Sequence, residues 1–229
     1  MKNILIVGGS SGIGLALVEQ LAEDHNVFVA SRTSESLVGK NCTHIPYDVM
    51  SQELDVSLLP ELHGFVYCPG SINLRPFKGL KPETFQADFD LNVMGAIKSL
   101  QALGKNLQAT THASVVFYST VAVQTGMPFH ASVAAAKGAL EGLTRSLAAE
   151  WAPKIRVNCI APSLVNTPLA DKFLNNEAKM EKAGERHPLQ RVGTAKEIAE
   201  ATAYFLSEKS GWMTGQIIQI DGGIGTLKT

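Results

Sequence analysis

Short runs of apolar residues alternate along the chain with longer stretches in which apolar residues recur every three or four positions. Several of the short runs are apolar at nearly every position, which is typical of strands covered on both faces. The strands predicted in this way are 4–7, 26–31, 43–49, 64–70, 114–120, 155–162 and 215–220. The predicted helices are 12–23, 82–107, 131–151 and 194–208, and Ile13, Leu17 and Leu21 form one apolar face of the first.

The alternation of strands and helices predicts an α/β fold, in which helices wrap both faces of a parallel sheet through right-handed crossovers. No internal repeat or low-complexity linker interrupts the pattern, so we expect a single domain over residues 1–229. The segment between Asp48 and the strand at 64–70 looks too short for a full crossover helix. We therefore expect an irregular connection there.

Composition narrows the class of protein. Apolar residues make up 45% of the chain, enough for a sizeable core, and the net charge of −1 without a basic cluster gives no footprint for nucleic acid or an anionic membrane. No apolar run reaches spanning length, and the first residues lack the layout of a signal peptide. The three cysteines, Cys42, Cys68 and Cys159, suggest buried thiols in a reducing cytosol. We expect a cytoplasmic protein with a small-molecule substrate, no nucleic-acid or membrane partner and no metal.

The first predicted strand runs directly into the glycine-rich sequence GGSSGIG, residues 8–14. Glycines in such a turn let the backbone approach a pyrophosphate closely, and the N-terminus of the following helix offers free N–H groups to the phosphates. Because this turn follows a strand and opens an amphipathic helix, we expect it to bind a dinucleotide. The predicted contacts are Gly8, Ser10, Ser11, Gly12, Ile13 and Gly14.

The end of the second predicted strand indicates which dinucleotide is bound. An acidic residue about 20 positions after the glycines would receive the adenosine ribose of NAD. This chain has Ser31 and Arg32 there, which can donate to a phosphate and pair with it bidentately. The sequence therefore favours NADP(H), although Arg32 could also be an ordinary surface arginine.

Together with this turn, HASVAAAKGALEGLTRSLAAEW (130–151) and GQIIQIDGG (215–223) resemble the short-chain dehydrogenase/reductase family over nearly the whole chain. The resemblance implies a Rossmann-like, doubly wound sheet of about seven strands and a homo-oligomer, a tetramer or a dimer. It also implies further cofactor contacts. Asp48 and Val49 would flank the adenine, and Cys68-Pro69-Gly70 stands where the family usually has Asn-Ala-Gly. Pro162 precedes Ser163 where Pro-Gly is usual, and Val165 and Thr167 would hold the nicotinamide amide and a phosphate. Asp221-Gly222-Gly223 matches the C-terminal turn.

The resemblance also carries over most of a catalytic set. Asn92 matches the family's asparagine and Lys137 its lysine, which would bond the nicotinamide ribose and lower the pKa of a neighbouring acid. Thr120 falls at the serine position and keeps a hydroxyl. The family's tyrosine lies four residues before the lysine, and here that position is Val133, which cannot donate a proton. Asn92, Thr120 and Lys137 each also have a purely structural interpretation.

Three sources could replace the missing acid. His130 lies seven residues, or two helical turns, before Lys137, a spacing similar to the Tyr-x6-Lys arrangement of enoyl reductases. A histidine can act as a general acid near neutral pH, but His130 could also simply precede the helix. Tyr118 and a water held by Asn92, Thr120 and Lys137 are the other two candidates.

The expected function follows from these residues. We expect an NADP(H)-dependent oxidoreductase that transfers a hydride to a small carbonyl, quinone or enone-type acceptor. Residues 166–188 are expected to cover the substrate, with Leu164, Leu169 and Phe173 as candidate lining. Val133 equally allows an inactive NADPH-binding sensor or assembly protein, and the small residues at 131–149 allow an oligomer interface.

Overall fold

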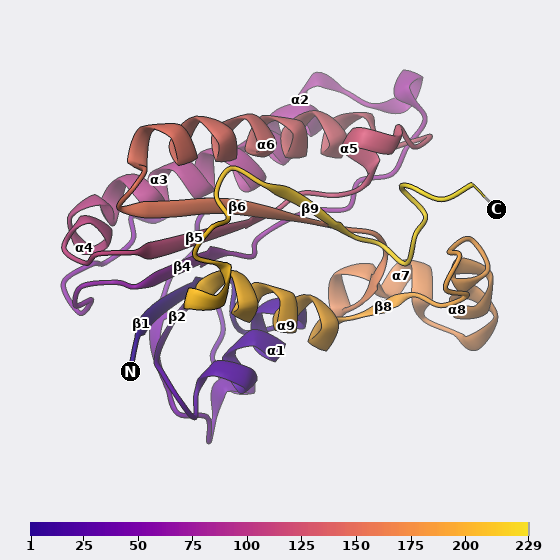
Figure 1. Ribbon diagram of the computed structural model, residues 1–229. Helices are drawn as coiled ribbons and strands as arrows, with labels where there is room; N and C mark the ends of the chain where they lie inside the picture. Colours follow the sequence, from indigo (N-terminus) through magenta and orange to yellow (C-terminus); the bar gives the residue numbers. More distant parts are fainter. Residues whose placement is uncertain (229) are drawn as a thin grey trace.

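The computed structural model describes residues 1–228. At its centre lies one seven-stranded sheet in which neighbouring strands are all parallel. The strand order is β3 (Cys42–Pro46), β2 (Asn26–Ser31), β1 (Asn3–Val7), β4 (Gly64–Tyr67), β5 (Ala113–Tyr118), β6 (Ile155–Pro162) and β9 (Ile217–Ile220). Helices cover both faces (Figure 1), so the predicted Rossmann-like α/β fold is confirmed.

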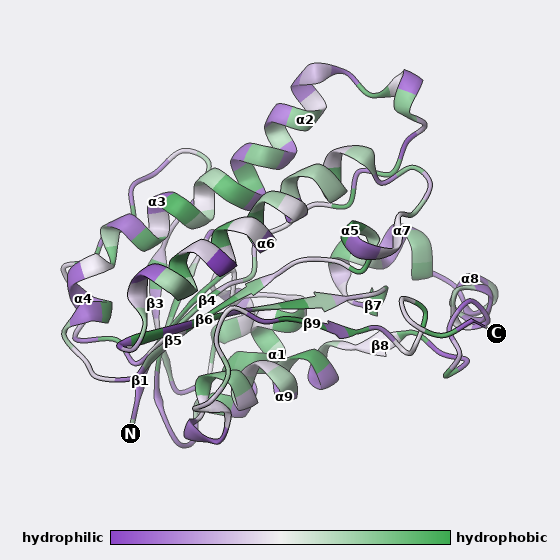
Figure 2. Ribbon diagram, turned by 45° about the horizontal axis from the view of Figure 1, so that its top comes forward, coloured by the Kyte–Doolittle hydropathy of each residue, from purple (hydrophilic) through white to green (hydrophobic). Residues whose placement is uncertain are grey.

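Two hydrophobic cores lie on opposite sides of the sheet. One forms against α1 (Gly12–Leu21) and α9 (Ala195–Leu206), and the other against α3 (Gly95–Ala102) and α6 (Ala131–Trp151), on which α2 (Pro82–Phe89) packs. Alternate residues of each strand belong to different cores: in β1, Ile4 and Ile6 face the first, and Leu5 and Val7 face the second. This explains why several strands are apolar at nearly every position. Figure 2 shows hydrophobic residues both in the central strands and on the helices that cover them.

The predicted helix over 82–107 is interrupted. After α2 the chain forms a π-helix at Asp90–Met94, continues as α3, and turns at Leu103 into α4 (Gly104–Gln108). In the π-helix the Gly95 amide donates to the Asp90 carbonyl, five residues back. The Asn92 side-chain amide donates to the Asp88 carbonyl at 2.7 Å. The bulge therefore turns a polar side chain inward, which the apolar periodicity of this stretch does not reveal.

The remaining connections are short. Residues 47–63 contain no helix, which confirms the irregular connection expected between β3 and β4. A small helix, α5 (Ala122–Thr125), follows β5. No helix within residues 1–228 has both the length and the apolar character needed to cross a bilayer.

Residues 166–188, the segment expected to cover the substrate, belong to the connection between two short paired strands. β7 (Val165–Asn166) and β8 (Gly193–Thr194) pair in parallel, and α7 (Asp171–Leu174) and α8 (Glu177–Gly184) lie between them. Figure 1 shows α7 and α8 at the end of the sheet where β5 and β6 finish. The two ends of the connection are thus fixed to each other at the carboxyl edge of the sheet.

Candidate active site

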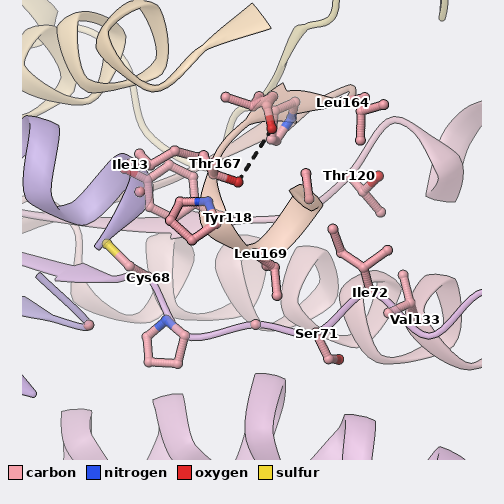
Figure 3. Close-up of a pocket in the computed structure, with 18 of the residues that line it drawn as sticks. Ile13, Cys68, Ser71, Ile72, Tyr118, Thr120, Val133, Leu164, Thr167 and Leu169 are labelled. Atoms are coloured by element: carbon pink, nitrogen blue, oxygen red, sulfur yellow. Dashed lines mark hydrogen bonds between the residues drawn. The ribbon is translucent and has the colours of Figure 1, made fainter. Parts of the chain in front are cut away.

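A cavity of about 810 Å³ opens at the carboxyl edge of the sheet, below α7 and α8. Every predicted cofactor contact lines it, from the glycine turn to Thr167. Of the predicted catalytic residues, Thr120, His130 and Lys137 line it, whereas Asn92 lies buried behind its wall. Figure 3 shows the lining side chains, with Ile13 and Cys68 toward one end and Ile72 and Val133 toward the other.

The glycine turn is built for close approach of the backbone. Gly8 has φ +79°, in the left-handed region, and its amide donates to the Ala30 carbonyl at 2.8 Å. A Cβ on Gly14 would lie 2.3 Å from the carbonyl oxygen of Gly8, so only glycine fits there. The Ser11 side chain does not cap α1, and the first-turn amides of a helix have no partner within it. This cradle and its free amides fit the pyrophosphate of a dinucleotide.

The end of β2 carries one cation beside this cradle. Arg32 is exposed, lines the cavity and has no carboxylate within 4.0 Å in the described part of the chain. The Ser31 hydroxyl already donates to the Thr33 carbonyl at 2.8 Å and also contacts His44 Nε2 at 3.1 Å. Thr33, in turn, donates to the Ser10 hydroxyl at 3.2 Å. Arg32 is therefore the group here that is free to pair with a phosphate.

Lys137 is almost entirely buried, with 7% of its surface exposed. Desolvation lowers the pKa of its ammonium from 10.5 to about 8, and Cys159, Cys68 and Asp88 act in the opposite direction. Its Nζ lies 3.3 Å from the position that a Cβ on Gly70 would take. Because Gly70 has no side chain, the Lys137 ammonium can lie next to its backbone and face the cavity.

Asn92 belongs to a buried polar cluster under the same glycine. Its Nδ2 donates to the Ser71 hydroxyl at 3.1 Å, and Ser71 donates to Asp88 Oδ1 at 2.6 Å. Asp88 also accepts from Asn73 at 2.6 Å, so it fixes the loop after β4. Asn92 Oδ1 is buried without a partner in the described chain and lies 3.3 Å from the same Gly70 position as Lys137 Nζ. A buried acceptor beside an ammonium is the kind of place that ordered water occupies.

The end of the cavity away from the glycine turn is mostly apolar. The hydroxyl oxygen of Thr120 accepts the Ala122 amide at 3.3 Å, which leaves its own hydrogen to be donated. Val133 is buried to all but 5% of its surface and lies on the cavity wall one helical turn before Lys137. Figure 3 shows Ile72 and Leu164 toward this end. Further apolar residues that line the cavity are Leu74, Leu91, Met127, Leu169 and Phe173.

The two protein side chains considered as replacements for the tyrosine differ in their surroundings. His130 precedes α6, and its Nδ1 contacts the Pro128 carbonyl at 2.7 Å, so Nδ1 carries the hydrogen and Nε2 is left for a ligand. The Tyr118 hydroxyl instead bonds the Thr202 hydroxyl at 2.7 Å inside the α1–α9 core. Burial raises the pKa of Tyr118 well above its usual value. The geometry thus argues against Tyr118 as the acid.

A histidine that the sequence reasoning missed also lies in the cavity wall. His187 is 4% exposed, its Nδ1 contacts the Ala183 carbonyl at 2.9 Å, and its Nε2 contacts the Ser163 hydroxyl at 2.8 Å. Because a carbonyl only accepts, Nδ1 carries a hydrogen, and Nε2 and the Ser163 hydroxyl share the second hydrogen bond. The available sequence signal was Ser163 itself, a hydroxyl where the family usually has glycine. Through Ala183, the pair links the residue after β6 to α8.

Burial of Lys137 makes a prediction about stability. Below pH 8 the lysine is protonated in both the folded and the unfolded chain, so the folded state carries the full cost of burying the charge. Lys137→Met should therefore raise the free energy of unfolding at pH 7 by up to about 3 kcal/mol. At pH 10 the gain should fall to about 1 kcal/mol, because the folded lysine is then neutral. Urea denaturation of both proteins at the two pH values measures this, and an equal gain at both would contradict it.

Comparison with known proteins places the chain among oxidoreductases. Residues 7–225 match the family model described as enoyl-(acyl carrier protein) reductase. The chain is 32% identical to the 2,5-dichloro-2,5-cyclohexadiene-1,4-diol dehydrogenase of Sphingobium indicum, over 99% of this chain and 98% of that protein.

Solved structures agree over the same length. A short-chain dehydrogenase family protein of Francisella tularensis superposes with a TM-score of 0.91 at 31% identity, covering 99% of this chain and all of that one. The NADP-bound structure of ElxO superposes with a TM-score of 0.89 at 26% identity, covering 99% of this chain and 100% of that one. A parallel seven-stranded sheet, a glycine cradle at its carboxyl edge and these relatives lead to one conclusion: the chain belongs to the short-chain dehydrogenase/reductase family of NAD(P)-dependent oxidoreductases.

Proposed function

We propose that this protein is an NADPH-dependent reductase whose acceptor is a conjugated carbonyl compound, an enone or a quinone, and whose proton donor is not a tyrosine. One observation carries the proposal. Of the family's catalytic set, Lys137 and Thr120 line the cavity and Asn92 lies behind its wall, while the tyrosine position on the wall is Val133. A protein that only bound the cofactor would have little use for the first three.

The preference for NADPH rests on charge. Arg32 is the unpaired cation beside the glycine cradle, and the strand end itself, Ser31 and Arg32, has no carboxylate to receive a free ribose hydroxyl pair. Guanidinium groups bind phosphate bidentately. The NADP-bound structure of ElxO, similar to this chain over its whole length, supports the same preference.

The acceptor class follows from the missing acid. A bound dihydronicotinamide would supply the hydride. When a hydride reaches a simple ketone, the charge left on oxygen needs immediate protonation, and a positioned acid contributes about 10²–10⁴-fold to the rate. When it reaches the β-carbon of an enone, the charge spreads over the conjugated system as an enolate, so the loss of the tyrosine matters less. The matching family model, whose description names an enoyl substrate, agrees with this class.

His130 is the proposed acid. Its Nδ1 hydrogen donates to the Pro128 carbonyl, so donation of a proton from Nε2 leaves the neutral tautomer that this contact already favours. Thr120 holds the acceptor oxygen through its free hydrogen. The ammonium of Lys137 keeps positive charge close to the developing enolate.

Val133 also favours a second candidate, a protein that binds NADPH without turning it over. Val133 is a small, buried residue in this wall, and its side chain has no group that can donate a proton. The two candidates share the cofactor cradle and differ in whether any acceptor consumes NADPH.

The cofactor preference can be tested at Arg32. Arg32→Ala should weaken NADPH binding about 10- to 100-fold, since a charge-assisted hydrogen bond contributes about 1.5–3 kcal/mol, and should leave NADH binding unchanged. Fluorescence titration with each cofactor measures this. Arg75→Ala, an exposed arginine outside the cavity, is the matched control. An equal loss for NADPH and NADH would contradict the assignment.

The acceptor class can be tested with a panel of enones, quinones and simple ketones. The wild-type protein should oxidise NADPH with the conjugated acceptors and only slowly with ketones. Val133→Tyr should raise the rate with ketones at least tenfold, because it restores a hydroxyl one turn from Lys137. Val133→Tyr combined with Lys137→Met is the control and should lose the gain. NADPH binding without oxidation across the whole panel, in both the wild type and Val133→Tyr, would leave the binding protein as the answer.

The role of His130 has its own test. His130→Phe keeps an aromatic ring but removes the proton, so it should lower kcat with an enone about 10²-fold and abolish the decline in rate with rising pH that an imidazolium donor imposes. An unchanged rate and pH profile would exclude His130. A loss in Ser163→Gly instead would assign the proton to the Ser163–His187 pair.

A further inference from the structure

Helix α8 lies within residues 166–188, the segment expected to cover the substrate, which we call the lid. The basic and acidic side chains of this helix lie on different faces. Lys179, Lys182 and Arg186 line the cavity, and Ala183 lines it between them. The glutamates at 177, 181 and 185 alternate with them in sequence but do not line it. At 3.6 residues per turn, positions 179, 182 and 183 of α8 fall on one stripe, and Glu177 and Glu181 fall on the opposite side. Glu185 and Arg186 lie in the turn that follows the helix.

These cations have no partner of opposite charge. Lys179 Nζ donates to Asn175 Oδ1 at 2.8 Å and to the Lys172 carbonyl at 3.2 Å, both neutral acceptors. The ion pairs found within residues 1–228 involve none of Lys179, Lys182 and Arg186. Around the whole cavity the ionised side chains are the cations Arg32, Lys137, Lys179, Lys182 and Arg186 and one carboxylate, Asp48. A protein with a net charge of −1 thus concentrates positive charge around this one space.

The lid cations lie at the acceptor end of the cavity. Ala183 and Met180 of α8 pack in a cluster with Ile72, Leu164 and Phe173, which belong to the apolar wall opposite the glycine turn. Lys172 Nζ donates to the Ile72 carbonyl at 2.7 Å, so the lid is held against the loop that carries this wall. The cavity therefore runs from an apolar chamber beside Lys137 to a group of cations on α8 and in the turn after it.

We propose that the acceptor is an anion. It combines an apolar skeleton, which carries the reducible bond and occupies the chamber, with a carboxylate or phosphate group that Lys179, Lys182 and Arg186 bind. We assign the cofactor phosphates to the glycine turn and Arg32 instead, which also line the cavity. This assignment rests on the proposed function for the reducible bond, but it concerns a separate group of the acceptor.

The test measures binding apart from turnover. Matched ligands are titrated by calorimetry into the protein saturated with NADP⁺, which cannot reduce them: 4-formylcinnamate against its methyl ester, and 4-formylphenyl phosphate against 4-methoxybenzaldehyde. Each anion should bind about 10- to 100-fold more tightly than its neutral partner, since hydrogen bonds to charged groups are the strong ones. The advantage should shrink at high salt, because the cations are exposed. The arm with the larger advantage identifies carboxylate or phosphate.

Variants assign the effect to the lid. Lys179→Gln with Lys182→Gln should remove at least tenfold of the advantage and leave the neutral partners and NADPH unchanged. Lys98→Gln with Lys209→Gln, two exposed lysines away from the cavity, makes the same charge change as a control. Equal binding of anion and neutral partner, or an advantage that survives in the lid variant, would overturn the proposal. A weaker affinity for NADPH in the lid variant would also overturn it, by assigning these cations to the cofactor.

The outcome is separable from that of the proposed function. If the wild-type protein binds the anions preferentially and oxidises NADPH with none of them, the anion site stands and the reductase falls. If it reduces the acid and the ester with equal kcat/KM and binds them equally, the reductase stands and the anion site falls.

Discussion

The reversal of strand order at β1 is the constraint on which the site depends. β1 pairs with β2 on one side and with β4 on the other, so the connections that leave β1 and β2 run one way across the sheet and those after β4 run the other way. In a doubly wound sheet this leaves a crevice at the carboxyl edge, where the connections diverge. The glycine turn follows β1, Cys68 follows β4, Thr120 follows β5 and Ser163 follows β6. These four residues or turns therefore lie at the cavity because each follows the end of a strand.

Sequence reasoning worked where a residue's role is local. The strands depend on neighbours within a few positions, and they form where the pattern predicted. The glycine turn and Arg32 line the cavity, and their contact with a cofactor stays a prediction. The π-helix at Asn92 was missed because it inserts a bend into an otherwise regular apolar period. Asp88 lies four residues before Asn92, and its role in holding Ser71 and Asn73 appears only once the loop after β4 folds back onto α2.

Other features of the site arise from contacts that sequence spacing does not encode. His187 contacts Ser163 across 24 positions, and Lys172 contacts Ile72 across 100. The charges of α8 alternate along the chain and sum to little, which is why no basic cluster is visible in the sequence. The helix separates them into two faces, and only the packing of the lid determines which face looks into the cavity.

Two positions of α6 differ in how they affect stability: Lys137 is a buried charge, and Val133 is a buried apolar side chain where the family has a tyrosine. Burying Lys137 destabilises the fold, so its retention is a stability cost that packing alone does not explain. Val133, one turn earlier, is buried. It lacks the phenol hydroxyl whose pKa such a lysine would lower. A cation can also stabilise negative charge on the acceptor directly, and this works best when the charge is delocalised and the acceptor is held still. Binding of a remote anionic group on α8 would supply that immobilisation, because contacts far from the reacting atoms can orient them. On this argument the lid cations and Lys137 act at the two ends of one molecule, and together they relax the need for an acid at position 133.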